Sequence, residues 1–366
     1  MKSWMKIAAV ILLLAMCGVV GCFGKKGEKV LRADSKDLKH TIVTPHLEAK
    51  IVGGKNLIYC CTFQLAWNDL RDNIVKDDIR LENEPPIVKS LNKKMTTKAD
   101  ISPDCYVAMA GFFKDGIIEK INRALRSKFG RRVPAEKEES EADFMAYAFL
   151  LKELDFATSF EDLKEPVYFR WGSGTTKLRA FGIREYQPRK RKHAKLATQF
   201  SILGVNYGTG ECIVRLTSKS PKDEIILAKV KPRKTLLETI RWVQRLTAEK
   251  DAGGDAFWEF DQHLPHGDTL QIPKLDFDIG HSYTELIRKR FLNRGFQDNQ
   301  ILVATQDIRL RLNERGAMLR SRAWMENEGG REAVFNEPFL VYLKEKQAKY
   351  PYLAIWVAHP EILMKG

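Results

Sequence analysis

Apolar residues recur along this chain with two spacings, and each spacing predicts one type of secondary structure. A spacing of three or four residues predicts a helix within Asn56–Val75, where a short apolar strand comes before Phe63, Trp67, Leu70 and Ile74. The same spacing occurs in Ile117–Phe129, which follows a strand-like run at Cys105–Phe113 and a Lys-Asp-Gly turn. A further short helix is expected within Ile87–Met95.

Short apolar runs separated by turns make up most of the remaining chain. Between Val167 and Trp242 they predict antiparallel strands that lead into a helix, TLLETIRWVQRL. Periodicity does not separate strand from helix in MAYAFLLKEL, residues 145–154, and a strand is our prediction. Thr269–Phe277 is predicted to be a strand and Tyr283–Arg290 a helix. Asp307–Pro360 reads as a strand, an exposed connector and two strands, so we predict an α+β fold.

The N-terminus has the pattern of a bacterial lipoprotein signal. An apolar run from Ile7 to Val20 follows two lysines and ends at Val19-Val20-Gly21-Cys22. As a helix this run would rise about 21 Å, short of the roughly 30 Å hydrocarbon core, so we expect it to be removed. Two alternatives stay open, an ordinary secretory signal in which Cys22 is incidental and an unprocessed hydrophobic end.

Cleavage before Cys22 defines the predicted organisation of the chain. Residues 1–21 are the signal peptide, residues 22–50 an acylated tether and chain entry, and residues 51–366 a single domain. Acylation of Cys22 would make the membrane a partner and place the domain outside the cytoplasm. Phe23 is not the aspartate that retains lipoproteins at the inner membrane, which favours the outer membrane if the organism has one.

Charge adds one candidate binding site. The formal net charge is +14, and the densest run of cations is Arg189–Lys195. This run lies between strand-like segments, so we expect a solvated loop. It is either an ordinary soluble turn or an anion-binding patch for a glycan or a lipid headgroup, formed by Arg189, Lys190, Arg191 and Lys192. An extracytoplasmic address argues against nucleic acid as a partner.

No motif predicts catalysis, a metal or a cofactor. Gly172–Thr176 lacks the lysine of a phosphate loop and is predicted to be a hairpin turn. The loop that contains Asp261, His263, His266 and Asp268 is not predicted to bind metal, and neither a nucleophile elbow nor HExxH is present. We therefore predict a non-enzyme without a cofactor. Four buried free thiols are expected, with one long-range disulfide as the alternative: Cys60, Cys61, Cys105 and Cys212.

The end of the chain resembles the end of a serpin, a member of the serine protease inhibitor superfamily. Residues 313–317 (NERGA) resemble the family's hinge, where a strand leaves the large sheet. Residues 335–340 (FNEPFL) are similar to the strand that re-enters after the reactive loop, and LAIWVAHP matches the last strand and closing proline. Weaker likeness in family order extends over most of residues 51–363, which makes the chain a divergent bacterial relative with a lipoprotein signal.

The resemblance implies an α+β fold with three β-sheets, one of them a large central mixed sheet, surrounded by helices. It also implies an exposed loop that proteases cut. The residues that match the hinge and loop are Glu314, Gly316, Ala317, Arg322, Gly330 and Arg331, and those of the re-entry are Phe335, Asn336, Pro338 and Phe339. In inhibitory members the cut loop inserts into the large sheet and traps the protease.

Several departures argue against insertion here. Met318–Arg322 is bulky where inhibitory relatives have small residues, and the alternation of Ile308, Leu310 and Leu312 continues to Arg320 and Arg322. A bulge at Arg315-Gly316 would instead turn Ala317 to the apolar face. The loop from Glu314 to Phe335 is also short for the family. Only Pro134–Asp143 stands where the family has a whole helix across the sheet, and Cys60-Cys61 replaces the family's serine and proline.

These departures predict a non-inhibitory binding module. The alternative is a working inhibitor of an extracytoplasmic serine protease. Its cleavage site would lie near Gly330-Arg331, or after Arg322 for a trypsin-like enzyme.

Overall fold

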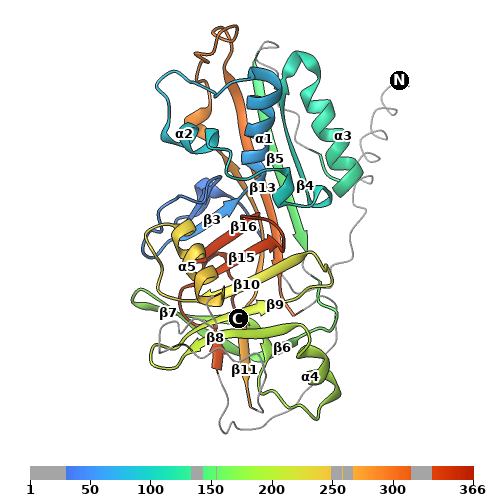
Figure 1. The fold of residues 1–366 in the computed structure, drawn as a ribbon, viewed down its shortest axis with the longest axis vertical. Coiled ribbons are helices and arrows are strands. Elements are labelled where there is room, and N and C mark those ends of the chain that lie inside the picture. The colour runs from blue at the N-terminus through green and yellow to red at the C-terminus, as the bar shows by residue number, and fades with distance from the viewer. Residues whose placement is uncertain (1–29, 133–142, 154, 249–257, 259–266, 315–331) are drawn as a thin grey trace, which may run out of the picture. The chain divides into compact units, whose positions relative to one another are not determined.

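The computed structural model describes residues 30–132, 143–153, 155–248, 258, 267–314 and 332–366 (Figure 1). Leu31–Gly366 forms one compact unit, and Met1–Val30 is a separate one. Within the described ranges, no helix has the length and apolar character that a membrane crossing needs.

A five-stranded mixed sheet contains the strand that leads to the hinge. Its order is β1 (Leu31–Asp34), β12 (Leu275–Ser282), β13 (Ile301–Leu312), β5 (Phe144–Glu153) and β4 (Tyr106–Phe112). β13 is antiparallel to β12 and parallel to β5, and the β13–β5 pairing runs from Ile301 to Arg311. We call the line where β5 and β13 meet the β5–β13 seam.

Helices cover both faces of this sheet. On one face α1 (Thr62–Asp69) buries Phe63 and Trp67 against Ala146 and Ala148 of β5. On the other face α3 (Ile117–Phe129) packs its apolar stripe against alternate residues of β5, namely Met145, Tyr147 and Phe149. Because side chains of a strand alternate between faces, both apolar sets of β5 are buried.

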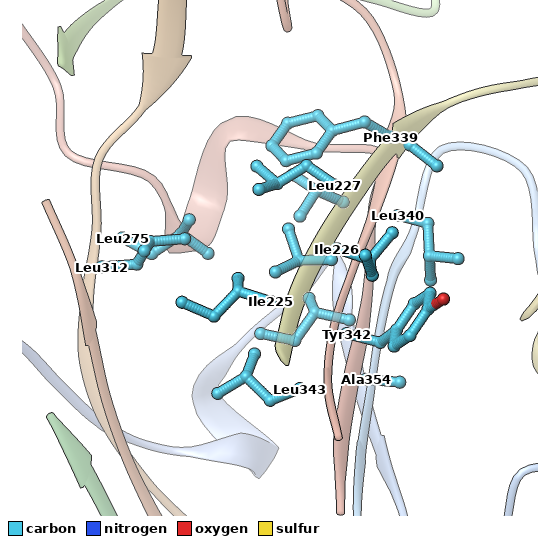
Figure 2. Close-up of a cluster of buried hydrophobic side chains, with 14 of the residues drawn as sticks. Ile225, Ile226, Leu227, Leu275, Leu312, Phe339, Leu340, Tyr342, Leu343 and Ala354 are labelled. Atoms are coloured by element: carbon cyan, nitrogen blue, oxygen red, sulfur yellow. The ribbon is translucent and has the colours of Figure 1, made fainter. Parts of the chain in front are cut away.

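Two further sheets complete the core. The seven-stranded sheet has the order β2 (Thr41–Thr44), β3 (Asn56–Cys60), β16 (Leu353–Val357), β15 (Phe339–Glu345), β10 (Asp223–Lys229), β9 (Glu211–Leu216) and β8 (Phe200–Asn206). The four-stranded sheet has the order β14 (Glu332–Val334), β11 (Thr269–Pro273), β7 (Gly174–Ile183) and β6 (Glu161–Trp171). Figure 2 shows Ile225 and Leu343 of the larger sheet beside Leu275 and Leu312, which joins the sheets in one core.

The remaining helices are short or lie on the surface of these sheets. They are α2 (Pro86–Asn92), α4 (Arg191–Leu196) and α5 (Leu236–Ala248). The predicted α+β class with three sheets, the strand at β5, the helix at α3 and the hairpin at Gly172–Thr176 are confirmed. The segment of the missing family helix lies mostly outside the described residues.

Three local predictions are wrong. Thr269–Phe277 is two strands that belong to different sheets and meet at Lys274, whose N–H still bonds the carbonyl of Arg179 on β7 (3.0 Å). Tyr283–Arg290 forms only a 3₁₀ turn at Thr284–Leu286, followed by Arg288 at a left-handed φ of 59°. The basic run expected to be a loop forms α4, whose Leu196 is buried.

The thiols agree with the prediction in all but one respect. Cys60, Cys61, Cys105 and Cys212 are free, and three of them are buried, but Cys105 is only partly buried. Burial raises the pKa of the Cys60 thiol to about 12 and that of Cys212 to about 11, so both stay protonated and unreactive at neutral pH.

Candidate functional site

The exit of the hinge from the large sheet is held by buried charges. Glu314, just past β13, is 5% exposed, and its Oε2 lies 2.5 Å from Nζ of Lys274, which is fully buried. The same ammonium lies 2.9 Å from Oδ1 of Asp162 on β6. The carbonyl of Glu314 also accepts a hydrogen bond from the N–H of Phe160 (3.1 Å). The exit is therefore bound to the four-stranded sheet through polar contacts.

The re-entry is built into the apolar core. β14 runs parallel to β11, and the N–H of Phe335 continues this pairing by donating to the carbonyl of Gln271 (2.9 Å). Phe335 and Phe339 are fully buried with ring centroids 5.3 Å apart. Pro338 is half-buried between them and the surface.

Polar contacts to Asn336 complete the re-entry. Its carbonyl accepts from the N–H of Arg170 (2.8 Å), and its side-chain oxygen lies 3.4 Å from the ammonium of Lys229. That ammonium also donates to the carbonyl of Val334 (2.8 Å). The re-entry turn is thus held in place by both apolar and polar contacts.

Exit and re-entry lie at opposite ends of β11. Glu332 is paired with Thr269 at the start of β11, whereas Glu314 contacts Lys274, which follows its last residue. A strand of this length spans about 17 Å. The remaining predicted hinge and loop residues, Gly316, Ala317, Arg322, Gly330 and Arg331, lie outside the described residues.

The β5–β13 seam is paired from Ile301 to Arg311, with α1 packed against one face and α3 against the other at the level of Val303. Ile308, Leu310 and Leu312 are buried in the core, as the predicted alternation requires. On the opposite face Arg309 is also buried, and it pairs with the carboxylate of Asp276 and donates to the carbonyl of Phe277 (2.8 Å). Near the hinge one face of β13 is therefore closed by the core, whereas on the other face Arg309 is buried and Asp307 and Arg311 are partly exposed.

A hydrogen bond crosses the seam on the α3 side. The hydroxyl of Tyr147 on β5 donates to Oδ2 of Asp307 on β13 (2.8 Å). Burial raises the pKa of the Asp307 carboxyl above its ordinary value. Separation of β5 from β13 would break this bond as well as the backbone pairing.

The predicted anion-binding patch is an exposed cluster of cations on and beside α4. The α4 cluster consists of Arg189, Lys190, Arg191, Lys192 and Lys195, all exposed. None of these side chains forms an ion pair with another residue that the structure describes.

A buried histidine within this run anchors α4. Nδ1 of His193 accepts from the N–H of Gln187 (2.9 Å), its Nε2 lies 3.2 Å from Oε1 of Glu161, and its ring stacks on Tyr186. Burial opposes ionisation of Glu161, but the bond from His193 lowers the pKa of that carboxyl overall. The sequence did not lead us to predict this role of His193. The available signal was the three-residue spacing of His193 and Leu196, which places both on one side of a helix.

The α4 cluster and the two ends of the hinge segment lie in the same part of the molecule. Glu161, which contacts His193, follows Phe160, which binds Glu314. The backbone N–H of Tyr186 donates to the carbonyl of Asp268 (2.7 Å). Asp268 is next to Thr269, which pairs with Glu332. Figure 1 shows α4 at the end of the unit that also holds β6 and β11.

Comparison with known proteins identifies this arrangement. No protein-family model and no curated protein matches the sequence. The solved structure of mouse protein-Z dependent protease inhibitor matches 85% of this chain and 92% of its own, with 12% identity and a TM-score of 0.51. This chain has the serpin fold.

Other structures of the same fold match more partially. Human glycosylated kallistatin is 15% identical over 68% of this chain, with a TM-score of 0.42, and a serpin from Schistosoma mansoni is 14% identical over 68%, with a TM-score of 0.38. The chain covers 66% and 65% of these two proteins, just under two thirds of their length.

The serpin-fold unit shows no metal-binding cluster among its described residues. Asp268 is buried beside β11, whereas its predicted neighbours Asp261, His263 and His266 lie outside the described ranges. The lipidation candidate Cys22 lies outside them as well.

Proposed function

We propose that this protein is a non-inhibitory, non-catalytic binding module of the serpin fold, attached to the cell envelope by a lipid on Cys22. The observation that supports it is the cover on both faces of the β5–β13 seam. A strand inserted there would have α1 on one side and α3 on the other.

The sequence after the hinge conflicts with such an insertion. Arg320 and Arg322 are two residues apart, so both would fall on one face of an inserted strand. A bulge at Arg315-Gly316 changes which face this is, but not the burial, since Phe149 and Ala148 on the two sides are both buried. An unpaired buried arginine costs several kcal/mol. We propose that the loop instead remains a recognition segment.

A protease assay tests non-inhibition. The Cys22→Ala chain without its signal is incubated with a trypsin-like protease, and we expect cleavage without an adduct that survives denaturing gel electrophoresis. The melting temperature of the nicked protein should equal that of the intact one, because no strand has been added. A covalent adduct, or a higher melting temperature after nicking, would refute the proposal.

A matched variant identifies the alternative function. If an adduct forms with the wild-type loop and disappears in Arg331→Ala but not in Arg322→Ala, the protein is an inhibitor with its reactive bond near Gly330-Arg331. Adduct loss in Arg322→Ala alone would assign the reactive bond to that residue.

The proposed address rests on the signal sequence. Cell fractionation should find the native protein in the membrane fraction and the Cys22→Ala variant outside it. Metabolic labelling with a fatty acid should mark only the native protein. Unlabelled native protein, or a variant that stays in the membrane fraction, would refute lipid attachment at Cys22.

A further inference from the structure

No cation of the α4 cluster forms an ion pair with an acidic residue that the structure describes. Glu161 is engaged by His193 and senses the charge of Lys192, Oε2 of Glu185 accepts from Nε2 of Gln187 (3.2 Å), and Oε1 of Glu165 accepts from Nη1 of Arg184 (2.9 Å). The cluster therefore keeps its positive charge, which is available to an external anion.

The cluster is also held in a defined arrangement. Four of the five cations lie on α4 or at its N-cap, and the buried side chains of His193 and Leu196 attach this helix to the body. Lys192 and Lys195 are both exposed, and Lys195, two residues after His193, projects from the opposite side of the helix. A set of cations positioned in this way loses less conformational freedom on binding than a flexible tail would.

The path of the chain brings this cluster within reach of the proposed lipid. β1 runs parallel to β12 with Leu31 opposite Phe277, so the chain before Leu31 enters from the end of β12 that begins beside Lys274. Lys274 contacts Asp162, and the adjacent Glu161 contacts His193 of α4. Residues 22–30 extend at most about 30 Å, so a lipid on Cys22 would hold Leu31, and with it this end of the large sheet, within that distance of the bilayer.

We infer that the α4 cluster docks on acidic lipid headgroups of the membrane that carries the N-terminal lipid. This inference rests on the proposed lipid attachment at Cys22. The acyl chains hold the body beside the bilayer, so the cluster meets a high local concentration of headgroup anions. Its contribution is to orient the body, with the exit at Glu314 and the re-entry at Glu332 turned toward the membrane. A partner of the loop would then be a membrane-associated molecule.

Vesicle binding of the unlipidated protein tests this docking separately from lipidation. The mature chain with Cys22→Ala is mixed with phosphatidylcholine vesicles, with and without phosphatidylglycerol, and bound protein is measured by flotation. We expect binding only to the acidic vesicles and its loss at high salt, because screening weakens attraction to surface charge. Equal binding to both vesicle types, or none to either, would overturn the inference.

A pair of charge-matched variants localises the effect. Lys190→Gln/Arg191→Gln/Lys192→Gln should weaken binding to acidic vesicles about tenfold or more. Lys231→Gln/Lys234→Gln/Arg241→Gln removes the same charge from exposed positions near α5 and should bind like the parent protein. Equal losses in the two variants would mean that net charge, not the α4 cluster, drives binding, and would overturn the inference.

Binding to a soluble polyanion distinguishes lipid headgroups from a soluble polymer as the ligand of the α4 cluster. If the α4 variant loses retention on dextran sulfate but keeps its vesicle binding, the cluster recognises a soluble polymer and the inference is wrong. Cell fractionation of the same variant should still find it in the membrane fraction, because its acyl chains are intact. Failure of vesicle binding with intact fractionation would reject only this inference, whereas failed fractionation of the native protein would reject the proposed lipid attachment.

Discussion

The two ends of the hinge segment are attached to the same sheet by opposite kinds of interaction. The exit at Glu314 is held by a buried ammonium between two carboxylates, whereas the re-entry at Phe335 and Phe339 is held by fully buried aromatic rings. Burial of rings adds directly to stability. A buried ion pair gains little net free energy after desolvation, but it becomes costly when one partner is lost.

This difference indicates which end of the hinge segment is more sensitive to changes in its contacts. Lys274 depends on the charge of Glu314 and Asp162, so substitution acts strongly on the exit. The re-entry depends mainly on the packing of its rings, and the ammonium of Lys229 adds a hydrogen bond to the carbonyl of Val334. We therefore expect the exit to be the end that loosens first.

The largest effect is expected at the re-entry. Phe339→Ala removes a fully buried ring that packs on Phe335 and Phe169. It should lower the free energy of unfolding by about 4 kcal/mol, measured by urea denaturation. Tyr168→Ala, at an exposed position of the neighbouring strand, should change it by less than about 0.5 kcal/mol. Similar losses in both variants would contradict the assignment of the re-entry to the core.

The exit should show a smaller loss with strong coupling. Glu314→Gln leaves the buried ammonium of Lys274 with one carboxylate and should cost about 3 kcal/mol. Lys274→Met/Glu314→Gln should cost less than the sum of the single changes, because no unpaired buried charge remains between them. Additive losses in this double-mutant cycle would show that the two groups do not act as a pair.

A surface ion pair is the control for the exit. Arg170 pairs with Glu337 beside the re-entry, and both side chains are substantially exposed. Arg170→Ala should cost less than about 1 kcal/mol. A loss as large as that of Glu314→Gln would mean that burial is not what makes the exit sensitive.

A histidine on β12, the strand that also contains Phe277, makes stability depend on pH. Burial lowers the pKa of His281 on β12 from 6.5 to about 4, and the charge of Asp34 opposes this shift. The unfolded chain takes up the proton at a higher pH than the folded one, so stability falls as the pH drops from 6.5 toward 4. His281→Gln should reduce this acid loss by on the order of 2 kcal/mol, allowing for partial exposure.

Stability measured at several pH values checks this expectation. The parent and His281→Gln proteins should differ in slope between pH 6.5 and 4 and run parallel above that range. Identical slopes would contradict the assigned role of His281.

The sequence by itself determined those helices and strands in which buried residues recur at one regular spacing. The stripe of α3, the alternation of β13 and the aromatic re-entry at Phe335 and Phe339 were readable because adjacent residues decide them. The serpin fold and the exit at Glu314 were indicated by the resemblance of residues 313–317 and 335–340 to the family's hinge and re-entry.

Only the tertiary structure decided the environment of residues whose contacts come from distant parts of the chain. Lys274 lies in an apolar run that reads as one strand, and only its contacts with Asp162 and Glu314 explain a charge at a fully buried position. His193 likewise lay in a run of cations, and its contact with Glu161 made that run a helix attached to the body. Periodicity reports the average environment of a segment, whereas the burial of a single charge is set by the particular group that the fold brings to it.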